Sequence, residues 1–142
     1  MRAAAFALAI TLVPLSCQSR LSKQEYAHRA DAICAKYNQK IRALARPHRL
    51  KDLPGYVDRA LPVAKGGTNE LRSLRPPKDE EAVAKDWLAQ NDAAVAALVR
   101  LRDAARRGDR LGVQNALFDA TAANRAASRF ARQLGLRVCA RG

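Results

Sequence analysis

Arg29-Ala-Asp-Ala-Ile-Cys34 decides the fold of this chain, because its cysteine can pair with Cys139 near the C-terminus. A disulfide between Cys34 and Cys139 would tie the two ends of the fold together. It would close a loop of about a hundred residues and contribute about 4–5 kcal/mol by its effect on chain entropy. Alternatively, the two residues are free buried thiols, because buried cysteine also behaves as a small hydrophobe.

The length and composition favour one all-α domain. A chain of 142 residues can build one real core, but it is short for two domains. Hydrophobic residues make up 49% and aromatic residues only 5%. The hydrophobic excess is alanine and leucine, which are strong helix formers.

The N-terminus resembles a secretory signal. Met1-Arg2 supplies a positive charge, and the apolar run Ala3 to Leu15 is too short to span a bilayer. We therefore predict a signal peptide over residues 1–16 and a mature chain outside the cytoplasm. A plain buried helix is the alternative.

Leu15-Ser16-Cys17 resembles the lipobox of bacterial lipoproteins, in which the cysteine is lipidated and becomes the first residue. Pro14 stands where a lipobox usually has leucine, so ordinary cleavage after Ser19 remains an alternative. Lipidation of Cys17 would also leave an even number of cysteines for pairing. We predict lipidation of Cys17 and a tether over residues 17–21.

The first two helices are predicted from caps and apolar spacing. Ser22-Lys-Gln-Glu25 is a capping box that starts a helix, and Pro47 stops it near Arg46. A second helix begins at Asp52-Leu-Pro54. Pro62 and the glycine pair after it predict a kink, or two short helices, between Ala60 and Thr68.

The third and fourth helices are predicted as an antiparallel pair. The third runs from Lys78 to Arg107, with acidic residues first and basic residues last, and Gly108 follows it. Asp109 caps the fourth helix, which Gly135 stops. The short connection makes these helices antiparallel neighbours.

Short connections throughout predict an up-down-up-down antiparallel four-helix bundle over residues 22–142. In this topology the fourth helix ends level with the start of the first. The tail Leu136 to Cys139 must therefore lie against the first helix if it is to reach Cys34.

Asn91 and Asn124 interrupt the apolar stripes of the third and fourth helices at nearly the same height. Facing each other, they would form a buried amide pair that fixes helix register. Alternatively, each asparagine lies at the edge of its stripe and meets water.

No motif predicts catalysis or a cofactor. Glu25-Tyr-Ala-His28 matches the Glu-x-x-His pair of ferritin-like bundles, but the second such pair and the additional glutamates are missing. Glycine-rich phosphate loops, Cys-x-x-Cys motifs and nucleophile elbows are also absent from the sequence. We predict a protein that is not an enzyme and has no metal or cofactor.

The net charge of +13 predicts attraction to anionic surfaces. If the first and last helices are neighbours, their basic residues form a continuous strip that could hold lipid headgroups or anionic envelope polymers, with nucleic acid not expected. The alternative is a solvated surface. The residues of this predicted strip are Lys36, Lys40, Arg42, Arg125, Arg129 and Arg132.

Several stretches together resemble those of small exported, lipoprotein-like proteins of actinobacteria. They are the signal with Cys17, Ala30-Asp-Ala-Ile-Cys34, Leu74-Arg-Pro-Pro77 and Leu134-Gly-Leu-Arg-Val-Cys139. The resemblance covers nearly the whole mature chain. It implies a helical protein with a terminal cysteine pair, and it implies no activity or ligand.

The leading hypothesis from the sequence is a non-enzymatic, lipid-anchored cell-envelope protein on the outer face of the membrane that binds another envelope component. A second hypothesis is a carrier or sensor of a small ligand, with a pocket near the break from Pro62 to Gly67 and beside Trp87. A third is a basic surface that binds anionic polymers or lipid headgroups.

Overall fold

The computed structural model describes residues 20–141 of the chain. The predicted signal peptide, the lipidation of Cys17 and most of the tether lie outside the described residues.

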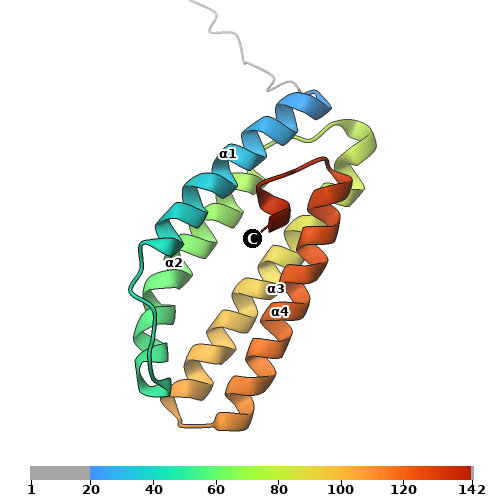
Figure 1. Cartoon of the computed structure of the whole chain (residues 1–142). Coiled ribbons are helices and arrows are strands. Elements are labelled where there is room, and N and C mark those ends of the chain that lie inside the picture. Colours follow the sequence, from blue (N-terminus) through green and yellow to red (C-terminus); the bar gives the residue numbers. More distant parts are fainter. Residues whose placement is uncertain (1–19, 142) are drawn as a thin grey trace, which may run out of the picture.

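Four long helices that pack on one another form the fold, and the described residues contain no strand. The prediction of an all-α fold is confirmed. Each long helix packs against the one that follows it in sequence (Figure 1). The long helices are α1 (Lys23–Arg42), α2 (Leu53–Arg72), α3 (Glu81–Arg106) and α4 (Arg110–Gln133), and the short 3₁₀ helices are η1 (Leu50–Asp52), η2 (Lys78–Glu80) and η3 (Cys139–Arg141).

The predicted helix ends are largely found. The Ser22 side chain accepts a hydrogen bond from the Glu25 amide at 3.2 Å, and the Asp109 carboxylate accepts one from the Gly112 amide at 2.8 Å. Gly108 and Gly135 have φ angles of 68° and 74°, the left-handed conformation that ends α3 and α4. These local signals therefore set the start of α1, the end of α3 and both ends of α4.

Of the two forms predicted for the second helix, the split into two short helices is wrong, because α2 is continuous from Leu53 to Arg72. A kink within it stays a prediction. Pro62 lies on its exposed side, where water can reach the backbone carbonyl that proline leaves unpaired. The glycine pair accommodates a neighbour instead of breaking the helix. A Cβ atom at Gly67 would lie 3.1 Å from Cγ of Tyr37, so glycine lets α1 approach closely.

The first helix is shorter than predicted. It ends at Arg42, and an extended connection runs from there along α2 toward the other end of the molecule (Figure 1). Since a helix rises 1.5 Å per residue, the 20 residues of α1 cannot cover the full length of the 26 residues of α3.

The C-terminal tail is fastened to α1, as the sequence predicts. Cys34 and Cys139 form a disulfide, with their Cα atoms 5.3 Å apart. Asp31, one turn before Cys34, accepts three backbone hydrogen bonds from the tail. Arg137 donates to Oδ2 at 2.8 Å, and Val138 and Cys139 donate to Oδ1 at 2.8 and 3.0 Å.

The predicted contact between the first and last helices is wrong. No Cα atom of α1 lies within 8 Å of one in α4, whereas η3 contacts both helices and lies between them (Figure 1). The tail takes the place that direct helix packing would fill in a closed bundle. The tail thus leaves a gap between α1 and α4, which we call the seam.

The buried residues form two separate cores. The first core joins all four helices and the tail around Trp87, Tyr26 and Leu134. The second core lies where α3 meets α4 and contains no residue of α1. Its buried members are Val57, Leu61, Leu101, Ala104, Ala105, Val113 and Ala116.

Asp31→Ala should lower the free energy of unfolding by about 2 kcal/mol, because hydrogen bonds to a charged group are stronger than neutral ones. Asp86→Ala is the matched control, an exposed aspartate within α3. Urea unfolding of the oxidised protein measures both. Equal stability of the two variants would contradict the role of Asp31.

Gly67→Ala should be less stable than Gly55→Ala by about 1 kcal/mol, although alanine is the better helix former in both cases. At Gly55 the nearest atom to an added Cβ is the end of the Arg59 side chain, at 3.6 Å, whereas at Gly67 the ring of Tyr37 must move. Thermal unfolding of the two variants compares them, and a more stable Gly67→Ala would show that the approach of α1 tolerates a methyl group.

Candidate functional site

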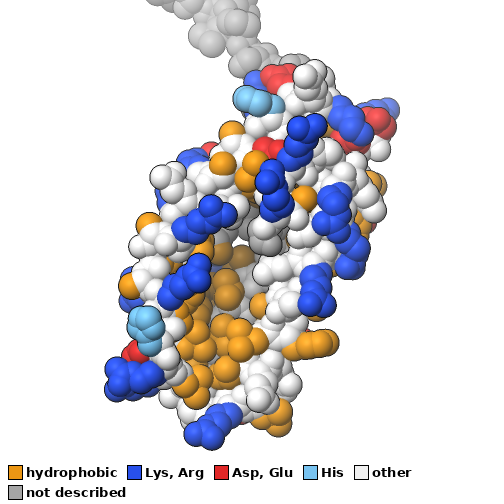
Figure 2. All heavy atoms as spheres, in the orientation of Figure 1, with side chains coloured by type: hydrophobic (Ala, Val, Ile, Leu, Met, Phe, Trp, Pro, Cys, Tyr) orange, Lys and Arg blue, Asp and Glu red, His pale blue; other side chains and the backbone are white. Residues whose placement is uncertain are grey.

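A cavity of about 340 Å³ lies between the two cores and opens through the seam between α1 and α4. Figure 2 shows this opening as a hollow with a hydrophobic floor. Lys and Arg side chains stand along its edges, over α1 on one side and over α4 on the other (Figure 2). All four long helices contribute to its wall.

The cavity exists because the helices carry small side chains at its level. The apolar stripes continue through this region, but alanine and glycine leave the space between the cores unfilled. Small residues spread over two turns of α2 and of α4, with another on α3, are a signal in the sequence that we did not use. These residues are Ala60, Ala64 and Gly67 of α2, Ala94 of α3, and Ala120 and Ala127 of α4.

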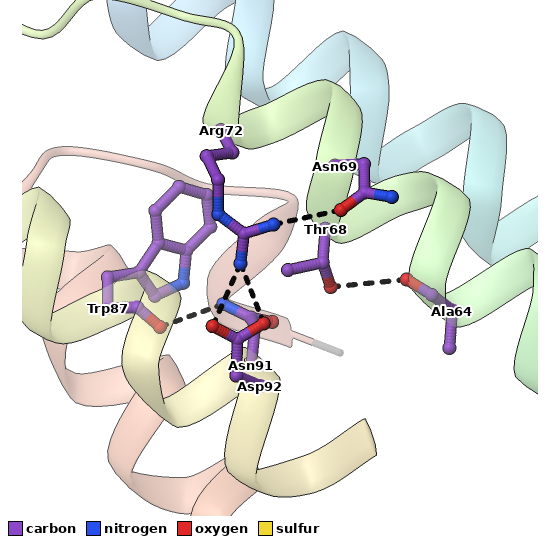
Figure 3. Close-up of polar contacts among 7 residues, drawn as sticks. All are labelled: Ala64, Thr68, Asn69, Arg72, Trp87, Asn91 and Asp92. Carbon is purple, nitrogen blue, oxygen red and sulfur yellow. Dashed lines mark hydrogen bonds and ion pairs between the residues drawn. The ribbon is translucent and has the colours of Figure 1, made fainter. Parts of the chain in front are cut away.

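Polar groups on α2 and α3 give the cavity a small polar component. The Thr68 hydroxyl donates to the Ala64 carbonyl oxygen at 3.1 Å, and Nδ2 of Asn91 donates to the Trp87 carbonyl oxygen at 2.9 Å (Figure 3). Both side chains lie between the two helices and line the cavity (Figure 3). The Asn91 amide keeps an oxygen that can accept a further hydrogen bond.

An ion pair joins α2 to α3 beside these groups. Arg72 Nη2 donates to both carboxylate oxygens of Asp92, at 2.7 and 2.8 Å, and Nη1 donates to Asn69 at 2.8 Å (Figure 3). Exposed ion pairs add little stability, about 0–1 kcal/mol. The pair spans α2 and α3 at this side of the cavity.

Trp87, the only tryptophan of the chain, reports on the cavity. Its side chain is 2% exposed and lines the cavity from the first core. The sequence placed a pocket beside Trp87 and the segment from Pro62 to Gly67. The structure has a cavity there, although continuous helix and not a break forms its α2 wall.

On the α1 side, Tyr37 lines the cavity and interacts with charged neighbours. Lys36 Nζ lies 2.6 Å from Oε1 of Glu70, and the hydrogen bonds from Lys36 and then Tyr37 hold the pKa of Glu70 below its usual value. The hydrogen bond to Glu70 raises the pKa of Tyr37. Lys36 and Lys40 also lie over the Tyr37 ring, 4.9 and 4.7 Å from its centre.

The predicted buried pair of Asn91 and Asn124 is not found. Asn124 is exposed, and Asn91 donates to its own helix. The expectation depended on a closed bundle. Because the seam between α1 and α4 is open, both amides line the cavity instead of meeting in a dry core.

The six predicted anion-binding residues do not form one strip. Lys36, Lys40 and Arg42 lie on α1, Arg125, Arg129 and Arg132 lie on α4, and the cavity and the tail separate the two groups. Lys36 is already paired with Glu70. Anion binding by any of these residues stays a prediction.

The Glu-x-x-His match has an ordinary surface role. Glu25 forms an ion pair with Arg29 at 2.6 Å, and His28 is exposed. Within residues 20–141, no three His, Cys, Asp or Glu side chains come together as metal ligands.

Within residues 20–141, none of the helices combines the length and the apolar character that crossing a membrane requires.

Comparison of the chain with protein-family models, with curated proteins and with solved structures found no match.

Proposed function

We propose that this protein is an exported, non-enzymatic binding protein that carries a small apolar ligand in the cavity between its helices. The observation that supports this proposal most is the cavity itself, which is open to solvent at the seam and lined mainly by apolar side chains. Its volume of about 340 Å³ falls within the range of small-molecule sites.

The lining is of the kind that binds such ligands. Ile33, Leu71, Val95 and Leu98 offer apolar contact from three helices, and a few polar groups, such as that of Thr68, can fix the orientation of a ligand. An apolar ligand would connect the two cores and remove this surface from water. At about 25 cal/mol per Å² of buried apolar area, that burial supplies the affinity.

The proposal includes export. The disulfide between Cys34 and Cys139 is of the kind that persists in oxidising compartments. Together with the signal-like residues 1–16, it supports a location outside the cytoplasm, with the chain held at the membrane by lipid on Cys17. The proposed bundle has up-down-up-down order, with the seam between its first and last helices left open for the ligand.

We favour a carrier over an anionic-polymer surface for a structural reason. A polymer-binding strip would need the basic residues of α1 and α4 side by side, and no Cα atom of α1 lies within 8 Å of one in α4. Binding of another envelope protein remains compatible with a carrier, since a loaded carrier must deliver its ligand.

Binding should be visible in the fluorescence of Trp87. Titration with 1-decanol should change the emission with saturation, because an apolar chain in the cavity alters the surroundings of the indole. Ala94→Leu, which fills the cavity, should weaken this binding about tenfold or more. Ala93→Leu is the matched control, since Ala93 is exposed on the same helix and does not line the cavity, and it should bind as the unchanged protein does.

Two results would contradict the proposal. If Ala94→Leu and Ala93→Leu bind decanol equally well, the ligand does not enter the cavity. If the protein sediments as a dimer and binds decanol only when dilution separates the dimer, a second copy of the chain occupies the cavity instead of a small molecule.

A further inference from the structure

We infer that the ligand is a single-chain amphiphile with an anionic headgroup, whose chain lies in the cavity and whose headgroup lies against Arg125, Arg129 and Arg132 on α4. This inference rests on the proposed function and names the class of ligand. Three observations carry it: the continuity of two depressions, the unpaired state of these arginines, and the position of the tail.

The apolar cavity continues into a polar depression on α4. Asn124 and Ser128 line both, so the two spaces meet over these side chains. Beyond them the wall consists of the three arginines together with Thr121 and Ala140. A molecule that leaves the cavity across Asn124 and Ser128 therefore passes directly from apolar to cationic surroundings.

The three arginines form one stripe, because they are spaced four and three residues apart on a helix. No carboxylate lies within ion-pair distance of any of them among residues 20–141. By contrast, Lys36 on the other side of the cavity is paired with Glu70, and Arg100 is paired with Asp119. An anion at the stripe would meet guanidinium groups that have no competing partner.

The tail contributes to both spaces. Ala140, next to the disulfide, lines the depression, while Cys139 lines the cavity. The binding space thus joins one apolar and one cationic part beside the tail. That shape fits one headgroup on one chain better than a repeating polyanion.

Ligands with the same ten-carbon chain and different headgroups test the inference. Isothermal titration calorimetry with decanoate, 1-decanol and decyltrimethylammonium compares a negative, a neutral and a positive headgroup at one chain length. We expect decanoate to bind about tenfold tighter than decanol and decyltrimethylammonium weakest, with the advantage of decanoate shrinking as salt is raised. Acetate, which has the charge without the chain, should bind too weakly to compete.

The variant Arg129→Gln should weaken decanoate binding about threefold to tenfold and leave decanol binding unchanged. Arg110→Gln is the control. Like Arg129→Gln, it removes one positive charge from an exposed position of α4, but Arg110 does not line the depression. Far-ultraviolet circular dichroism checks that both variants keep their helices.

The outcomes separate the inference from the proposed function. Equal binding of decanol and decanoate would leave the carrier standing and overturn the anionic headgroup. The inference also fails if Arg110→Gln weakens decanoate binding as much as Arg129→Gln does. A polyphosphate that binds at the stripe without displacing decanoate would assign the arginines to another ligand. No binding of any ten-carbon compound would overturn the proposed function itself.

Discussion

The attachment of the C-terminal tail to α1 is the constraint on which the rest of the structure depends. The carboxylate of Asp31 accepts hydrogen bonds from three consecutive tail amides, and the neighbouring disulfide makes the attachment covalent. Together, the hydrogen bonds and the disulfide hold η3 in the place where α1 and α4 would otherwise pack. Without the tail there, the apolar faces of these two helices would be free to close on each other.

The cavity follows from this arrangement and from the small residues at its level. The first core ends at Trp87 and Leu71, the second begins near Leu61 and Leu101, and alanines and glycine lie between them. Filling that space with larger side chains would stabilise the fold by burying apolar surface. The unfilled space, open on one side and bordered by unpaired arginines, is therefore the feature that a function must explain.

The sequence predicted what depends on local chemistry. Caps at Ser22 and Asp109 and the glycine stops of α3 and α4 depend on nearby residues, so they were predictable. The cysteine pair was predictable by elimination. The open seam was not predictable, because it depends on how α1 and the tail are placed relative to each other. The close contact of Tyr37 with Gly67 was not predictable either, because it depends on which helix packs against α2 there. Asp31 was also missed, although it lies three residues before Cys34.

The most direct test of the account is where a bound chain lies. Nuclear Overhauser contacts from carbon-13-labelled decanoate to the protein would locate it without any mutation. We expect contacts from the methyl end to Tyr37, Ala94 and Leu98, which line the cavity from α1 and α3. Contacts only to the exposed outer side of α4, where Phe118 is 75% and Leu111 66% exposed, would contradict it.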